Sequence, residues 1–187
     1  MGKIVVTEFI SLDGVVEAPG GEDFKYPDWS FEIDRGPDGE RFKETEALGA
    51  DALLLGRTTY EGFAEAWPQY EGELADKYNA MPKYVFSSTL TDPSWNNTSV
   101  LSGDLPEAVA RIKEDVAGEI SVPGSLRLVR DLVRHDLVDT IRLMIIPLVL
   151  GHGQVLWPAT PDKTVWKLTE ATAYGDGVLV TVHERQR

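Results

Sequence analysis

The run Ala52-Leu53-Leu54-Leu55-Gly56-Arg57-Thr58-Thr59-Tyr60-Glu61 joins an apolar strand directly to the start of a helix. The apolar residues end at Gly56, and Arg57 and two hydroxyl side chains follow where the helix begins. The free N–H groups of a helix start favour an anion, glycine lets a ligand approach the backbone, and arginine donates a forked pair of hydrogen bonds. The run therefore predicts a phosphate-binding junction. An ordinary strand end followed by a helix N-cap has the same composition and stays open as the alternative.

Length and composition predict a single globular domain over residues 1–187. The chain has 187 residues, of which 42% are hydrophobic and 26% charged, and these are the proportions of an ordinary globular protein. No apolar run is long enough for a signal peptide or a membrane span, so we expect a cytoplasmic protein. The absence of cysteine excludes disulfides, thiolate catalysis and cysteine-ligated metals.

The formal net charge of −13 opposes binding to nucleic acid and to anionic membranes. The same field opposes an anionic cofactor, so a phosphate site would depend on clustered cations and backbone donors. The three histidines lack the close spacing typical of a three-ligand site, and we expect no metal site. The predicted partner is a small molecule.

The order of predicted elements indicates an α/β fold. Apolar and β-branched runs predict strands at 3–10, 52–55, 83–88 and 120–122, and helical spacing predicts helices at 38–48, 58–66, 75–79, 105–116 and 126–137. A long strand is predicted over 139–150, interrupted at Pro147, and a hairpin over 164–172 and 177–184. We therefore expect a mixed, mostly parallel sheet flanked by helices, with a C-terminal antiparallel hairpin.

Three predicted strand-to-helix junctions meet at the carboxyl edge of the parallel strands, where α/β proteins bind ligands. They are Gly56-Arg57-Thr58, Ser87-Ser88 and Gly124-Ser125. Arg127 follows in the first turn of a predicted helix, where a cation opposes the helix dipole unless an anion is bound. A dinucleotide fits these junctions better than a nucleoside triphosphate, because the Gly-x4-Gly-Lys-Ser/Thr loop is absent. The Rossmann Gly-x-Gly-x-x-Gly fingerprint is absent as well.

The segment 17–39 is a predicted long loop rich in proline and glycine that carries Tyr26, Trp29 and Phe31. Aromatic residues on such loops often form lids or binding walls, and they also form small local cores. We take Trp29 as the candidate substrate-binding residue of this loop.

Five stretches follow one another along the chain in a distinctive order: Ser11-Leu12-Asp13-Gly14, then 55–61, 83–90, 124–139 and 147–153. Together they resemble the dihydrofolate reductase-like proteins, specifically the branch that shares the C-terminal reductase domain of the bifunctional riboflavin-biosynthesis protein. The resemblance covers nearly the whole chain and implies that fold, NADPH as cofactor, and a homodimer.

The resemblance also implies roles for individual residues. It places Arg57 with Ser87 or Ser88 near the adenosine 2′-phosphate, and Asp13-Gly14 beside the nicotinamide. It places Thr58 and the Gly124-Ser125 turn at the pyrophosphate. The complete set of candidate cofactor residues is Gly14, Gly56, Arg57, Thr58, Ser87, Ser88, Gly124, Ser125, Leu126 and Arg127.

The function that follows is an NADPH-dependent reductase that transfers a hydride to a C=N or C=O bond of a small molecule. The substrate would be pterin- or folate-like, or ribosylaminopyrimidine-like. Asp13, Asp38, Glu40 or an ordered water would handle the proton, and ordinary helix-start and turn chemistry is the alternative for each carboxylate. A nucleotide-binding module without catalysis is the alternative function.

Overall fold

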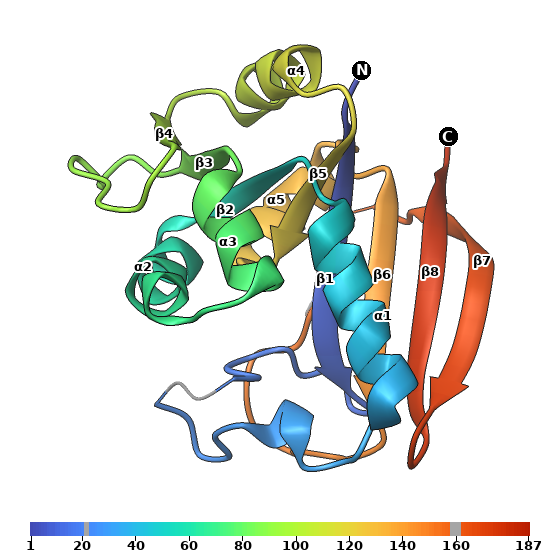
Figure 1. Ribbon diagram of the computed structural model, residues 1–187. Coiled ribbons are helices and arrows are strands. Elements are labelled where there is room, and N and C mark those ends of the chain that lie inside the picture. Colours follow the sequence, from blue (N-terminus) through green and yellow to red (C-terminus); the bar gives the residue numbers. More distant parts are fainter. Residues whose placement is uncertain (21–22, 158–161) are drawn as a thin grey trace. The chain divides into compact units, whose positions relative to one another are not determined.

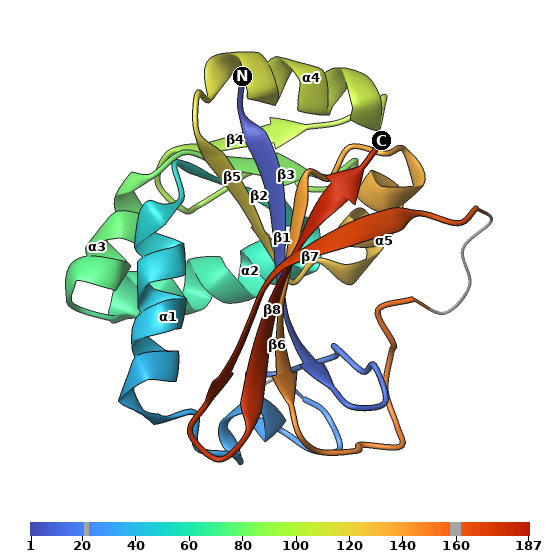
Figure 2. The same cartoon turned by 90° about the vertical axis from the view of Figure 1, so that its right-hand side faces the viewer.

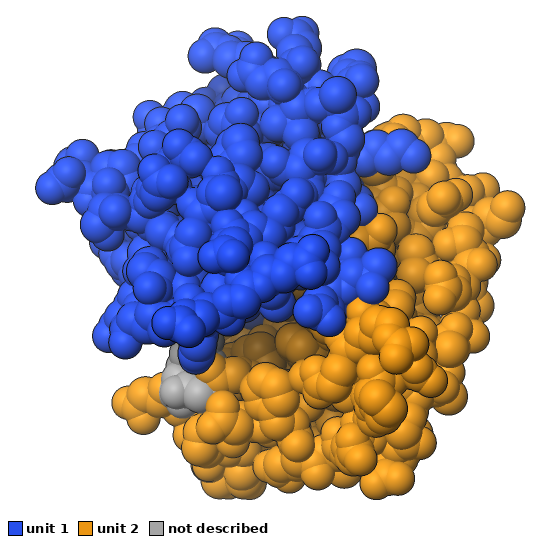
Figure 3. Space-filling model, viewed as in Figure 1, with its two compact units in different colours: residues 1–6, 44–138 blue, residues 7–43, 139–187 orange. Residues whose placement is uncertain are grey.

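The computed structural model describes residues 1–20, 23–157 and 162–187 (Figure 1). These residues form two compact units, each assembled from two separate segments of the chain. Unit 1 contains Met1–Val6 and Glu44–Val138, and unit 2 contains Thr7–Lys43 and Asp139–Arg187 (Figure 3). The single domain over residues 1–187 stays a prediction.

The strands follow the order β4-β3-β2-β5-β1-β6-β8-β7 in one 8-stranded sheet. Strand β1 (Lys3–Ser11) has its first residues in unit 1 and its last residues in unit 2. The strands of unit 1 pair in parallel, and β6, β8 and β7 of unit 2 pair antiparallel. The predicted fold class is therefore confirmed: an α/β fold with a mixed, mostly parallel sheet and a C-terminal antiparallel hairpin.

Unit 1 is built on four short parallel strands, β2 (Ala52–Gly56), β3 (Lys83–Phe86), β4 (Thr98–Leu101) and β5 (Glu119–Pro123). Its helices are α2 (Arg57–Ala66), α3 (Glu73–Ala80), α4 (Leu105–Asp115) and α5 (Leu126–Arg134). Figure 2 shows α2 and α3 on one side of these strands and α5 on the other. Strand β2 is buried from Ala52 to Leu55, because its leucines face packed layers on both sides.

Unit 1 also contains a fully buried lysine at the start of β3. The ammonium of Lys83 donates to the backbone oxygens of Asn79 at 3.1 Å, Met81 at 2.8 Å and Asn96 at 2.9 Å. It also lies 4.3 Å from the centre of the Trp95 ring. Desolvation lowers the pKa of Lys83 to about 8. All three N–H donors are used, so this charge stabilises the end of α3 rather than facing a ligand.

Unit 2 is built on β6 (Thr140–Ile146), β7 (Val165–Tyr174) and β8 (Val178–Gln186). The β7–β8 hairpin closes as predicted, with the amide of Gly177 donating to the carbonyl of Tyr174 at 3.1 Å. Helix α1 (Gly36–Gly49) begins in unit 2 and ends in unit 1. The short 3-10 helix η1 (Trp29–Phe31) precedes α1 in unit 2, and a second, η2 (Trp67–Gln69), follows α2 in unit 1.

Three differences from the sequence-based expectation exceed a shift of two residues at the end of an element. The strand predicted over 139–150 ends at Ile146, because Pro147 has no N–H group with which to continue the ladder. The helix predicted to reach residue 137 ends at Arg134, and Asp136 nearby has a left-handed φ of 54°. Strand β4 was not predicted, since its four residues at the sheet edge carry a weak pattern.

Candidate functional site

The three predicted phosphate junctions lie together in unit 1. Gly56 pairs with Phe86 across β2 and β3, so Ser87 follows directly beside it. The amide of Gly56 donates to the Ser125 hydroxyl at 2.9 Å, which joins the end of β2 to the turn after β5. The carboxyl ends of β3, β2 and β5 therefore meet at one edge, in agreement with the expected geometry of a parallel sheet.

Two helix starts at this edge have no capping side chain. Helix α2 follows Gly56 and helix α5 follows Ser125, and neither N-cap residue accepts a hydrogen bond from the first turn. Neither helix has an acidic residue in its first turn. Because the first amides of a helix have no partner within it, both starts present free N–H groups. In contrast, Asp104 caps α4 by accepting from the amide of Glu107 at 2.9 Å.

Each uncapped helix start carries an arginine. Arg57 is half-exposed, and among the described residues its guanidinium pairs with the Glu61 carboxylate alone, at 3.7 Å. Arg127 is exposed and has no hydrogen bond or ion pair with the described residues. A cation in the first turn opposes the helix dipole, so both arginines are unfavourable there unless an anion offsets them. Arg134 at the other end of α5 is different, since it pairs with Asp131 at 2.7 Å.

The remaining predicted cofactor residues of unit 1 surround these helix starts. The Ser87 hydroxyl accepts from the amides of Thr89 at 3.2 Å and Leu90 at 3.1 Å, which leaves exposed Ser88 as the freer hydroxyl. Thr58 is exposed, and Leu126 is partly buried.

Gly124 matters because of its conformation. Its φ is +58°, and a Cβ at this position would lie 3.5 Å from the Thr59 hydroxyl of α2. The contact is an ordinary van der Waals distance, so glycine is favoured here because of its left-handed φ rather than because of crowding.

In unit 2, Asp13 joins two loops. Its carboxylate accepts from the Ser11 hydroxyl at 2.6 Å and from the amides of Leu150 at 3.1 Å and Gly151 at 2.8 Å. The Ser11 hydrogen bond is the largest of the effects that lower the pKa of Asp13. Gly14 completes the turn with a φ of +83°. A carboxylate held in this way stays ionised at neutral pH, which is unsuited to donating a proton.

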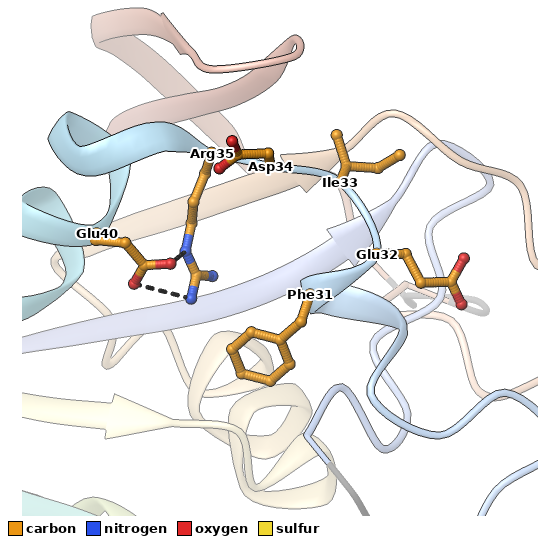
Figure 4. Close-up of a pocket in the computed structure, with 6 residues that line it drawn as sticks. All are labelled: Phe31, Glu32, Ile33, Asp34, Arg35 and Glu40. Carbon is orange, nitrogen blue, oxygen red and sulfur yellow. Dashed lines mark hydrogen bonds and ion pairs between the residues drawn. The ribbon is translucent and has the colours of Figure 1, made fainter.

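The two other candidate acids lie near the start of α1. Asp38 is exposed and pairs with Arg41 at 3.2 Å. Glu40 forms a two-pronged ion pair with the buried Arg35, at 2.7 Å and 3.1 Å, beside a pocket of about 280 Å³ (Figure 4). Of the three candidates, only Glu40 lines this pocket.

Trp29 is a core residue. Its side chain is 0% exposed, and it packs with Met144, Ile146 and Val178. The indole N–H donates to the carbonyl of Glu17 at 2.9 Å, so its polar group is satisfied within the fold. The aromatic residue of this loop that faces solvent is Phe31, which is 58% exposed. A substrate contact by Trp29 stays a prediction, and the structure offers Phe31 in its place.

Residues 2–180 match the model of the RibD C-terminal domain. The chain belongs to this family. It is also similar to the uncharacterized proteins YyaP and YwjB of Bacillus subtilis (strain 168). The identities are 27% for YyaP, covering 97% of this chain and 94% of the relative, and 26% for YwjB, covering 94% of each.

Two solved structures share the fold of this RibD C-terminal domain. A protein from Shewanella sp. PV-4 whose name refers to riboflavin biosynthesis has a TM-score of 0.81 and 19% identity, and the match covers 99% of both chains. A pyrimidine reductase-like protein from Corynebacterium diphtheriae has a TM-score of 0.66 and 12% identity, covering 99% of this chain and 92% of that one. The predicted family is confirmed.

Sequence reasoning missed one ionisable residue of this RibD C-terminal domain. Glu8 lies in the middle of β1, is 4% exposed, and its Oε1 has no hydrogen-bond partner among the described residues. Burial raises the pKa of Glu8 to about 8, and the charge of Lys43 opposes that rise. The signal was one acidic residue within the strand Lys-Ile-Val-Val-Thr-Glu-Phe-Ile-Ser, which is otherwise mostly apolar.

Two features are absent from the described residues. Within residues 1–20, 23–157 and 162–187, no three His, Cys, Asp or Glu side chains are grouped as metal ligands. None of the helices in the same part of the chain combines the length and the apolar character that crossing a bilayer requires.

Proposed function

We propose that the protein is an NADPH-dependent reductase that transfers a hydride to a C=N or C=O bond of a small molecule. The observation that carries the proposal is the pair of uncapped helix starts in unit 1, each with an arginine in its first turn. Membership of the RibD C-terminal domain family supports a reductase-like chemistry. When bound, NADPH supplies the hydride.

The residues present fit a phosphorylated dinucleotide. A pyrophosphate carries two negative charges, and the starts of α2 and α5 offer two sets of free amides joined through the Gly56–Ser125 hydrogen bond. The Thr58 hydroxyl and the Gly124-Ser125 turn would bind the same pyrophosphate. Arg57, at the β3 side of this edge, would hold the 2′-phosphate with the hydroxyl of Ser88 and that of Ser87.

The proton step depends on unit 2. We assign to Asp13 the positioning of the Gly14 turn, because its ionised carboxylate holds the amides of Leu150 and Gly151. For the proton we propose a water bound to Glu40, since Glu40 lines a pocket and Asp38 does not, while the Glu40 carboxylate itself is engaged by Arg35.

A nucleotide-binding module without catalysis is the second candidate function. It is favoured by the structural contacts that already engage the carboxylates of Asp13 and Glu40. Turnover separates the two candidates: loss of nicotinamide absorbance with a panel of C=N and C=O acceptors supports the reductase. Cofactor binding without turnover of any acceptor supports the module.

The cofactor assignment is tested by titrating nicotinamide fluorescence with NADPH and with NADH. For Arg57→Ala we expect NADPH binding to weaken by about 1.5–3 kcal/mol, the scale of a hydrogen bond to a charged group, and NADH binding to weaken less. For Arg127→Ala we expect both cofactors to weaken alike, because the pyrophosphate is common to them.

Arg111→Ala is a matched control for Arg57→Ala. Arg111 is exposed and lies 3.8 Å from Glu107 four residues earlier, much as Arg57 lies 3.7 Å from Glu61 four residues later. We expect no change in affinity for this variant. An equal loss of NADPH and NADH in Arg57→Ala would contradict the 2′-phosphate contact, and no fluorescence change with NADPH at any practical concentration would contradict the cofactor itself.

A further inference from the structure

The turn of the β7–β8 hairpin lies next to the start of α1, and both belong to unit 2 (Figures 1 and 2). The amide of Asp176 in this turn donates to the carbonyl of Asp34 at 2.7 Å. Asp34 immediately precedes Arg35, and its carboxylate accepts from the amide of Gly36 at 2.7 Å. The backbone around Arg35 is therefore held by hydrogen bonds, one of which comes from a hairpin at the other end of the sequence.

Two glycines of the turn differ in what surrounds them. Gly175 has a φ of +48°, and a Cβ there would overlap the carbonyl oxygen of Asp34 and lie 2.8 Å from the Cα of Arg35. Gly177 has a φ of +101°, but a Cβ there would meet no atom of the described residues within 4 Å. The turn conformation explains Gly177, since glycine adopts a positive φ without strain. Gly175 meets a second requirement, because any side chain there would push the turn away from Asp34 and Arg35.

The first turn of α1 also packs closely on Arg35 and on the hairpin. A Cβ at Gly39 would lie 2.8 Å from the Cβ of Arg35 and 3.2 Å from the Cβ of Tyr174, the last residue of β7. Both distances are shorter than an ordinary contact between carbon atoms. Glycine at this position therefore allows α1, Arg35 and the end of β7 to pack against one another.

The side chain of Arg35 extends from this fixed backbone into the pocket. It is 7% exposed, and its guanidinium carbon lies 5.3 Å from the centre of the Phe9 ring and 5.1 Å from that of Phe31. Its Nε and Nη2 groups donate to the two carboxylate oxygens of Glu40 at 2.7 Å and 3.1 Å (Figure 4). Glu40 is 62% exposed, and an exposed carboxylate gains little order from an ion pair with a mobile partner. The position of Glu40 therefore depends on how firmly Arg35 is held.

We propose that the β7–β8 turn positions the Arg35 guanidinium and, through it, the Glu40 carboxylate, so that Gly175 and Asp176 are positioning residues of this pocket. Neither residue lines the pocket, and their effect passes through the backbone of Asp34 and Arg35. A functional site needs its groups held to within about 0.5 Å by the residues behind them. The consequence for catalysis rests on the proposed function, in which a water bound to Glu40 handles the proton.

The Nε–H group of Arg35 reports on this positioning directly. Its exchange with water is followed by ¹⁵N NMR on the full chain without cofactor, and its signal is assigned by its loss in Arg35→Lys. In the native protein we expect slow exchange, because this N–H is hydrogen-bonded and its side chain is buried. For Gly175→Ala we expect exchange at least about tenfold faster, because the pair opens more readily. Gly177→Ala is the matched control, since it adds the same methyl group at a positive φ without the contact, and we expect a change below about twofold.

A second variant decides the question if Gly175→Ala does not fold. Replacing Gly175-Asp176-Gly177 by the dipeptide Asn-Gly closes the hairpin with a two-residue turn and removes the contact with Asp34. All three replaced residues are exposed, so no buried side chain is lost and we expect this variant to fold. We expect the same acceleration of exchange at the Nε–H of Arg35.

The indole N–H of Trp29 is the internal control. It is buried in unit 2 and hydrogen-bonded within the fold, so a general loosening of this unit would accelerate its exchange as well. We expect its exchange to change by less than about twofold in every variant. Rapid Arg35 exchange in the native protein, unchanged Arg35 exchange in either folded turn variant, or equal acceleration of Arg35 and Trp29 would overturn the proposal. Equal effects of Gly175→Ala and Gly177→Ala, or failure of the shortened hairpin to fold, would overturn it as well.

Kinetics of the same variants test the link to the proposed function. The turn contains none of the candidate cofactor residues, so we expect NADPH affinity to stay within about twofold while kcat falls about tenfold or more. An unchanged kcat together with faster Arg35 exchange would overturn the catalytic part of the proposal. If the native protein reduces no acceptor, the proposed function fails, and the exchange of Arg35 still decides whether the turn positions it.

Discussion

Unit 1 and unit 2 each bury ionisable side chains, but they satisfy them differently. In unit 1, the ammonium of Lys83 donates all three of its hydrogen bonds to backbone oxygens. In unit 2, Glu8 is buried, and one of its carboxylate oxygens has no hydrogen-bond partner in the described part of the chain. Buried Arg35 is paired with an exposed partner, Glu40. The buried charge of unit 1, on Lys83, therefore stabilises the fold. Two other cations of unit 1, Arg57 and Arg127, lie at the surface. In unit 2, Glu8 instead keeps a proton at neutral pH, and Arg35 forms an ion pair with a carboxylate at the surface.

The largest expected effect concerns Glu8. Its pKa in the folded protein is raised to about 8, so the folded state binds a proton that the unfolded state releases at lower pH. The stability from this proton is fully present below the pKa of the unfolded chain and is lost as the pH rises to about 8. Glu8→Gln stays neutral at every pH, so we expect its free energy of unfolding to equal that of the native protein near pH 4 and to exceed it by about 4–5 kcal/mol near pH 8.5.

Urea unfolding of both proteins between those two pH values measures the difference. Glu44→Gln is the control, because Glu44 is exposed and should show no such pH dependence. If the free energies of unfolding of the native protein and of Glu8→Gln changed with pH in the same way, unit 2 would not hold this buried proton. The proposed difference between Glu8 and the fully hydrogen-bonded Lys83 would then be wrong.

The next effect compares the two buried cations directly. Lys83→Met leaves three backbone oxygens without their donor, and we expect a loss of about 3 kcal/mol in the free energy of unfolding. Arg35→Met leaves one charged partner, Glu40, which is 62% exposed and regains water, and the new methionine keeps apolar contact with Phe9 and Met144. We therefore expect a loss of about 1 kcal/mol in the free energy of unfolding. Urea unfolding of the two variants at pH 7 measures both losses. A loss from Arg35→Met equal to or above that from Lys83→Met would mean that unit 2 depends on its ion pair as strongly as unit 1 depends on its lysine.

More of the candidate site could be predicted from the sequence in unit 1 than in unit 2. In unit 1, each junction is local: a buried strand, a turn and a helix start lie within about ten residues, so the pattern around Gly56 or Gly124 identifies them. Their meeting at one edge follows from the parallel sheet, and the Gly56–Ser125 hydrogen bond agrees with it. The predicted strand that corresponds to β6 was too long, because apolar residues continue past Pro147. The hydrogen-bond ladder cannot continue there, since proline has no N–H group.

In unit 2, the important contacts join residues that are far apart in the chain. Asp13 is held by Leu150 and Gly151, and Arg35 contacts Phe9 and Met144. No local pattern encodes such contacts. Trp29 was predicted to bind substrate because it lies in an aromatic loop, and its burial, which no local pattern shows, depends on distant partners such as Met144 and Val178. The burial of Glu8 could have been predicted locally, because it is the one acidic residue in a mostly apolar strand.

The smallest expected effect concerns Asp13. Its pKa is lowered by contacts made to the ionised carboxylate, so their stabilisation is present above the pKa of the unfolded chain and is lost as the pH falls through the lower folded value. The group is exposed, so we expect Asp13→Asn to cost only about 1 kcal/mol at pH 7. Hydrogen exchange should accelerate at the amides of Leu150 and Gly151, which donate to this carboxylate. Asp38→Asn, which removes only an exposed pair with Arg41, is the control and should leave those amides unchanged. Unaltered exchange in Asp13→Asn would show that the 147–153 loop is held by other contacts, and Asp13 would then be free for the catalytic role that the sequence predicts.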